Sequence, residues 1–172
     1  GSEDDLVLNT ENFEYEQILS NKIKSSYHDV LVSAIDLYGN VGSNNISYYI
    51  SPISDWMEIK TNNGSEFNSG QTVLFVIDVF DQADEIMSKE VEFKIINSNG
   101  KRVLRDNLIS GQEFIYKLEE YEPPGEWKIT AEFEELESEL SFYILEVKDL
   151  DISIVDSLII IKNIGNVHYD DN

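Results

Sequence analysis

Residues 90–105 read EVEFKIINSNGKRVLR, and this stretch predicts a β-hairpin. In its first half Val91, Phe93 and Ile95 alternate with charged residues, which is the period of a strand that buries one face. The Asn-Gly pair that follows favours the positive φ angles of a tight hairpin turn, after which the chain returns in a second apolar run. An antiparallel sheet is therefore the expected structure of this part of the chain.

Short strand-like runs continue on both sides of this hairpin. They are rich in Val, Ile, Tyr and Phe, and clusters of Asn, Gly, Ser and Pro separate them at intervals of about 8–12 residues, as in a sandwich or barrel. Seven runs result, the number of an immunoglobulin-like sandwich: 56–60, 72–80, 90–96, 101–105, 113–118, 127–133 and 138–145. The side chains expected in its core are Phe75, Ile77, Phe93, Ile95, Trp127, Ile129 and Phe142. Stretch 13–24 lacks a sustained helical stripe and is predicted to be extended with turns.

The flanking segments predict less complete domains. Residues 27–50 contain one strand pair around a Gly39-Asn40 turn, and residues 150–163 contain two short apolar runs. We expect a partial immunoglobulin-like domain over 1–52, a complete seven-stranded sandwich over 53–147, and the opening strands of a further β domain over 148–172. The alternative is that these last strands pair with the first segment and complete it. In either case the uncharged run 158–161 should not lie free in solvent but should add to a sheet, either within residues 1–50 or on a neighbouring molecule.

Composition excludes several classes of function. The chain has 34 acidic and 12 basic residues, which gives a net charge of −22, and such a surface repels the phosphates of nucleic acids. Without cysteine there is no disulfide, thiolate metal site or cysteine nucleophile. No apolar run approaches the roughly 20 residues of a membrane span. The hydrophobic share of 41% is nevertheless enough for a folded core.

Three stretches carry a resemblance to known β-sandwich families. Residues 32–40 (VSAIDLYGN) resemble the A-x-D-x-x-G-N ending of bacterial and archaeal immunoglobulin-like repeats, with Ala34, Asp36, Gly39 and Asn40 at the matching positions. Residues 56–145 resemble macroglobulin-like domains of secreted prokaryotic proteins, through a Ser-Gly turn at 69–70 and the sequence PPGEW at 123–127. Residues 159–166 (IIIKNIGN) resemble the V-x-N-x-G-N opening of adhesion-type repeats in archaeal surface-layer proteins. The resemblance implies tandem antiparallel sandwiches in a multidomain cell-surface protein, and no particular ligand.

Acidic side chains gather in one loop and one turn. Calcium takes six to eight oxygen ligands from flexible carboxylates and carbonyls. The loop at 81–85, with an aspartate on the preceding strand, and the Asp-x-x-Gly-Asn turn are the candidate sites. Their ligands would be Asp78, Asp81, Asp84, Glu85, Asp36 and Asn40. The alternative is that these residues solvate loops and outer strand faces, since no EF-hand repeat is present. No other cofactor is expected.

Catalytic motifs are missing from the sequence. His28 and His168 lie far apart and in no metal-ligand spacing, and there is no G-x-S-x-G nucleophile motif or glycine-rich phosphate loop. We expect both histidines on the surface and a protein that is not an enzyme. Asn63 and Asn45 each begin an N-x-[ST] sequence, so both are candidate N-glycosylation sites in a secreted protein.

Aromatic residues leave a second function open. Trp56 and Trp127 begin strands with alternating apolar faces, so core packing is expected for both. A sugar-stacking platform, to which Tyr48, Tyr49, Tyr121 and Tyr143 would contribute, is the functional alternative. The leading hypothesis is a non-enzymatic structural or adhesive segment of an extracellular surface protein, whose partners are other β-sandwich domains of the same chain or of neighbouring copies. The alternatives are a glycan-binding module and an accessory domain of a secreted hydrolase.

Overall fold

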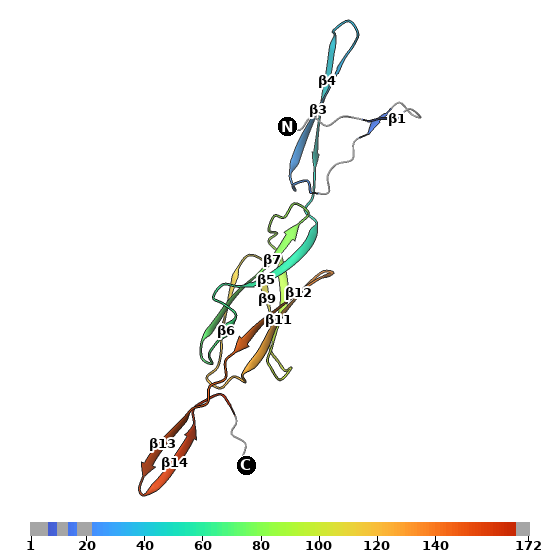
Figure 1. The fold of residues 1–172 in the computed structure, drawn as a ribbon. Helices are drawn as coiled ribbons and strands as arrows, with labels where there is room; N and C mark the ends of the chain where they lie inside the picture. The colour runs from blue at the N-terminus through green and yellow to red at the C-terminus, as the bar shows by residue number, and fades with distance from the viewer. Residues whose placement is uncertain (1–6, 10–13, 17–21, 168–172) are drawn as a thin grey trace. The chain divides into compact units, whose positions relative to one another are not determined.

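The computed structural model describes residues 7–9, 14–16 and 22–167. Every regular element in these residues is a β-strand, so the predicted all-β class is confirmed (Figure 1). Contacts divide the chain into two units, one of Gly1–Ile53 with Asp81–Glu85 and one of Ser54–Phe80 with Ile86–Asn172. The expected division near residues 52 and 147 stays a prediction. In the described residues no helix is long and apolar enough to cross a membrane.

The second unit contains a sandwich of two mainly antiparallel sheets (Figure 1). The first sheet has the order β10-β7-β5, with β5 at Ser54–Thr61, β7 at Thr72–Asp81 and β10 at Glu113–Lys117. The second has the order β6-β12-β11-β8-β9, with β6 at Glu66–Phe67, β8 at Glu90–Ile96, β9 at Arg102–Ile109, β11 at Gly125–Phe133 and β12 at Leu136–Ile144. All seven strands expected from the sequence are present. The order is that of an immunoglobulin-like sandwich whose fourth strand, β9, pairs in the second sheet.

The core of the sandwich is the one that the alternating pattern predicts. All seven residues expected inside are at most 1% exposed. Phe75 and Phe93 meet edge to face across the two sheets with ring centroids 5.3 Å apart. The indole N–H of Trp127 donates to the carbonyl of Pro123 at 2.9 Å, so the one polar atom of this fully buried ring is satisfied. The two-proline loop thereby contributes to the core although it joins no ladder.

Turn residues set the hairpin geometry of the second sheet. Gly100 has φ of +75° at the Asn-Gly position, as the sequence predicts. The side-chain oxygen of Asn97 accepts from the backbone N–H groups of Asn99 and Lys101 at 3.1 and 2.9 Å, which closes this turn from inside. At the β11–β12 turn, Glu134 takes φ of +53° without being glycine.

One short strand was not expected from the sequence. β6 pairs in parallel with the end of β12, with Glu66 opposite Tyr143 and Phe67 opposite Ile144. Two backbone hydrogen bonds extend this pairing, from the N–H of Tyr143 to the carbonyl of Ser65 at 2.7 Å and from the N–H of Leu145 to the carbonyl of Phe67 at 2.8 Å. The chain therefore begins the sandwich in one sheet with β5 and then contributes β6 to the other.

Three two-stranded sheets complete the described structure. β1 (Val7–Asn9) pairs with β2 (Glu14–Glu16), β3 (Tyr27–Ile35) with β4 (Val41–Tyr49), and β13 (Leu150–Val155) with β14 (Leu158–Asn163). The expected pair in residues 27–50 is confirmed. β2 lies in the stretch predicted to be extended, while residues 13 and 17–21 of that stretch fall outside the described residues.

The C-terminal hairpin bears on the expectation for run 158–161. Run 158–161 belongs to a sheet, as predicted, but within the described residues β13 and β14 pair only with each other and not with residues 27–50. Ile159 and Ile161 are 70% and 62% exposed. In the single chain this run is not covered, because a two-stranded sheet has no second layer. Addition of the run to a neighbouring molecule stays a prediction.

Candidate functional site

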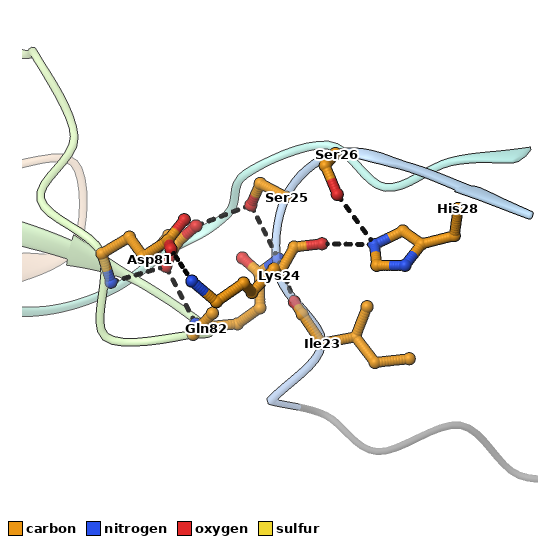
Figure 2. A network of polar contacts seen from close by, with 9 residues as sticks. Ile23, Lys24, Ser25, Ser26, His28, Asp81 and Gln82 are labelled. Carbon is orange, nitrogen blue, oxygen red and sulfur yellow. Dashed lines mark hydrogen bonds and ion pairs between the residues drawn. The ribbon is translucent and has the colours of Figure 1, made fainter. Parts of the chain in front are cut away.

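The loop Asp81–Glu85 takes part in a network of polar contacts with residues near the start of β3 (Figure 2). One carboxylate oxygen of Asp81 accepts from the backbone N–H groups of Ala83 and Glu85 at 2.9 and 3.0 Å, and the other accepts from the hydroxyl of Ser25 at 2.6 Å. Asp84 closes the turn with φ of +62°. The loop is thus wound around the Asp81 carboxylate and bonded to residues near the start of β3.

Gln82 continues this network with both ends of its side-chain amide. Its nitrogen donates to the carbonyl of Ile23 at 3.2 Å and to the hydroxyl of Ser25 at 3.0 Å, and its oxygen accepts from the N–H of Ile53 at 2.9 Å. Lys24 forms an ion pair with Glu85, and Lys22 pairs with Asp84 at 3.2 Å. Side chains of loop 81–85 and segment 22–25 and the backbone N–H of Ile53 therefore join these three parts; we refer to them together as the Asp81 clasp.

Electrostatics favours the charged forms in the clasp. The Ser25 hydrogen bond is the largest influence that holds the pKa of Asp81 below its ordinary value, and the N–H groups of Glu85 and Ala83 and the charge of Lys24 act in the same direction. The hydrogen bond and charge of Glu85 raise the pKa of Lys24. The clasp is consequently a set of mutually satisfied charges and not a reactive acid–base pair.

The predicted calcium ligands are occupied by donors of the chain. Asp81, Asp84 and Glu85 lie in the clasp, and Asp78, which is buried on β7, has the Lys60 ammonium 4.0 Å from its carboxylate. In the part of the chain that the structure describes, no group of three or more His, Asp or Glu side chains is placed to hold a metal ion. Calcium binding stays a prediction, to be tested by chelation.

The Asp-x-x-Gly-Asn turn joins the two residues that the sequence singled out. Asp36 accepts from the backbone N–H groups of Tyr38 and Asn40 at 2.8 and 2.9 Å and from the side-chain amide of Asn40 at 2.7 Å. These bonds, with that of the Asn40 side chain first, lower the pKa of Asp36. Gly39 supplies φ of +84°. In this structure the motif closes the β3–β4 turn through hydrogen bonds of its own.

The described residues include His28 but not His168. The Nε2 of His28 lies 2.8 Å from the carbonyl of Lys24 and 3.1 Å from the hydroxyl of Ser26, beside the clasp (Figure 2). Of the two candidate glycosylation sites, Asn63 is exposed but uses its side chain to bond Thr72 and Leu74 of β7, whereas Asn45 is exposed on β4. Glycosylation of either stays a prediction.

The two tryptophans differ in environment. Trp127 is in the core, as expected, but Trp56 is 37% exposed and stacks flat on Phe80, with ring centroids 3.9 Å apart. Among the tyrosines, Tyr27 and Tyr49 form an exposed cross-strand pair at the open end of the β3–β4 hairpin, with centroids 5.0 Å apart. Tyr49 was expected in a sugar-stacking platform, whereas the place of Tyr27 beside it follows only from the cross-strand register of β3 and β4.

A second clasp, around Asn166, was also missed. The buried side chain of Asn166 accepts from the N–H of Val147 at 2.7 Å and donates to the carbonyl of Leu145 at 2.9 Å and the hydroxyl of Ser69 at 3.0 Å. A Cβ on Gly165 would lie 2.1 Å from the carbonyl oxygen of Val147, so only glycine allows the two backbones to approach. Residues 163–166 thus bind the backbone of residues 145–147, which follow β12. The N-x-G-N pattern by itself did not indicate this role.

No family model and no curated relative matches the sequence. Among solved structures, the chain is similar to a tetra-tandem repeat in the extending region of a large adhesion protein, at 15% identity and a TM-score of 0.41, over 76% of this chain and 34% of that one. It is also similar to an amphioxus IgVJ-C2 molecule, at 14% identity and a TM-score of 0.32, over 70% of this chain and 59% of that one. The chain therefore spans about a third of the first of these structures and less than two thirds of the second.

Proposed function

We propose that this chain is a non-enzymatic structural segment of an extracellular, multidomain surface protein, and that its sandwich transmits tension along the chain. The observation that carries the proposal is the parallel pairing of β6 with β12. β6 lies near the start of the sandwich and β12 at its end. Tension applied to the two ends pulls these parallel strands in opposite directions along their axes, so their hydrogen bonds are strained together and not one after another.

The sandwich is also built to remain soluble in a crowded surface layer. Charged side chains alternate outward along its strands, and some form cross-strand pairs, such as Lys94 with Glu132 at 2.5 Å and Lys128 with Glu139 at 2.6 Å. A large excess of acidic residues remains, and a high net charge of one sign keeps neighbouring copies apart. This supports, together with the sequence resemblance, a prokaryotic surface-layer or adhesion protein as the parent molecule.

Two experiments test this function. In single-molecule stretching, Leu145→Pro removes the N–H that bonds Phe67 and should lower the rupture force of the sandwich well below that of the parent. Glu146→Pro is the control, because in the described residues its N–H makes no backbone hydrogen bond. Equal rupture forces for both variants and the parent would contradict the tension role.

Labelling of intact cells with an antibody to the chain tests the extracellular location, and labelling only after lysis would exclude it.

Glycan binding is the second candidate, and the exposed Tyr27–Tyr49 pair is the observation that favours it. Aromatic faces at a hairpin end offer stacking surface to a sugar ring. Retention on a polysaccharide column that Tyr27→Ala and Tyr49→Ala both abolish, with Tyr38→Ala as the exposed-tyrosine control, would favour this function. Passage of the parent chain through the column without delay would exclude it for that polysaccharide.

A further inference from the structure

The sandwich contains two Asn-Gly pairs, one at 63–64 between β5 and β6 and one at 99–100 between β8 and β9. All four residues are exposed, and both glycines have a positive φ, +103° at Gly64 and +75° at Gly100. Glycine has no Cβ, so its backbone nitrogen approaches the side-chain amide of the preceding asparagine with little hindrance. The two pairs thus share one reactive sequence, and only their surroundings distinguish them.

The side chain of Asn63 is held at both ends of its amide. Its oxygen accepts from the backbone N–H of Leu74 at 3.0 Å, and its nitrogen donates to the carbonyl of Thr72 at 2.7 Å. Both partners belong to β7, the middle strand of its sheet. In the described residues the N–H of Gly64 forms no backbone hydrogen bond. What restrains this pair is therefore the fixed amide and not the nitrogen that would attack it.

The side chain of Asn99 has no such support. In the part of the chain that the structure describes, its amide makes no hydrogen bond, while its backbone N–H donates to the side-chain oxygen of Asn97 at 3.1 Å. The N–H of Gly100 donates to the carbonyl of Asn97 at 2.9 Å. One exposed hydrogen bond therefore has to open before Gly100 attacks at Asn99, whereas two have to open at Asn63.

We propose that Asn99 is a site of spontaneous covalent modification in the folded protein, and that Asn63 is protected from it. The backbone nitrogen of Gly100 attacks the side-chain amide carbon of Asn99. A bond forms between these two atoms as the bond from that carbon to the amide nitrogen breaks, and the amide nitrogen leaves as ammonia with the proton of the Gly100 N–H. Water then opens the resulting five-membered imide at either carbonyl. The products are an aspartate or an isoaspartate at position 99, and no oxidant or reductant is needed.

The modification changes the turn between β8 and β9. Either product adds one negative charge, because a carboxyl group with a pKa near 3.9 is ionised at neutral pH. Isoaspartate also routes the main chain through the side-chain carbon and so lengthens it by one atom. That atom enters the turn that the side chain of Asn97 closes by accepting from the N–H of Lys101 at 2.9 Å. The turn should therefore weaken as the protein ages, whether or not the sandwich carries tension.

Incubation of the full chain in mildly alkaline buffer, followed by tryptic digestion and mass spectrometry, tests the proposal. Trypsin places the two pairs on separate peptides, 61–89 and 95–101. We expect Asn99 to convert about fivefold faster than Asn63 in the folded chain, because one more hydrogen bond has to open at Asn63. In urea, where neither side chain is held, the two rates should be nearly equal. Asn97 is the control within the same peptide, because the residue after it is serine and its side-chain oxygen is bonded.

Two results would overturn the assignment of Asn99. Equal rates at the two pairs in the folded chain would show that the bonds of Asn63 give no protection. Conversion of Asn99 in urea but not in the folded chain would show that the turn itself prevents the attack.

A variant separates the added charge from the added main-chain atom. Asn99→Asp has the charge alone, so the aged parent should melt several degrees below it. Equal melting temperatures for Asn99→Asp and for an aged sample in which mass spectrometry finds isoaspartate would contradict the weakened turn.

Discussion

Replacement of Trp127 tests the description of the sandwich core most strictly. Its side chain is fully buried, lies 5.9 Å from the ring of Phe142, and is fixed by the hydrogen bond from its indole nitrogen to Pro123. Trp127→Ala removes the largest buried side chain and should lower the free energy of unfolding by about 3–5 kcal/mol. For a domain of this size that loss corresponds to a fall in Tm of about 15 °C or more.

A second variant separates packing from hydrogen bonding. Trp127→Phe keeps most of the apolar volume but leaves the Pro123 carbonyl without its donor, which costs about 1–3 kcal/mol if no water reaches it. Urea unfolding followed by circular dichroism measures both variants, and Trp56 remains as an independent fluorescent probe. If Trp127→Ala changes the free energy of unfolding by less than 1 kcal/mol, or if Trp127→Phe is as damaging as Trp127→Ala, the structure of this core is wrong.

Four further predictions follow from particular contacts. Burial of the Tyr116 hydroxyl, followed by the charges of Glu122 and Glu119, raises the pKa of Tyr116 to about 12. The contribution of this group to the free energy of unfolding is therefore complete below pH 10 and is lost as pH rises from 10 to 12, and Tyr116→Phe should remove this alkaline loss of stability. Asp81 has a lowered pKa and stabilises above its ordinary pKa of about 3.9, with loss as pH falls through the folded value; in Ser25→Ala, an NMR titration should find that pKa nearer its ordinary value, and an unchanged value would refute the role of Ser25. Gly165→Ala should speed amide hydrogen exchange at Val147 and Asn166, because the new methyl group collides with the Val147 carbonyl. Gly42→Ala, whose methyl group meets no atom within 4 Å, should leave both rates unchanged. A calcium ion at the Asp81 loop or the Asp36 turn would stabilise the fold, so excess chelator should then lower the Tm by several degrees; an unchanged Tm would exclude a tight structural site.

The sandwich was predictable because its information is local. Alternation in β8, β11 and β12 and the Asn-Gly turn at Gly100 each involve neighbours in sequence, and together they fix strands, faces and core. β6 was not predicted, because a strand of two residues shows no alternation of apolar and polar side chains. Its pairing depends on β12, which lies far along the chain.

The polar clasps were not predictable because they join distant residues. In the sequence Asp81 is only one acidic residue of a loop, and such a residue fits a calcium ligand and a solvated surface residue equally well. Its role depends on the hydrogen bond from Ser25, which lies 56 positions away. The partner Ser69 of Asn166 is 97 positions away. A sequence pattern indicates that such residues form turns, but only the tertiary structure shows which segments the turns hold.

The most direct test of the tension role is to pull the same sandwich in two directions. The chain has no cysteine, so pairs of introduced cysteines define the points of attachment. Handles at Asp55 and Glu146 strain β6 against β12 along their axes, whereas handles at Glu126 and Glu146 open the antiparallel β11–β12 pair from its free end, one hydrogen bond at a time. We predict a rupture force several-fold higher for the first pair of handles than for the second. Equal forces in the two directions, or a lower force along the chain, would contradict the account.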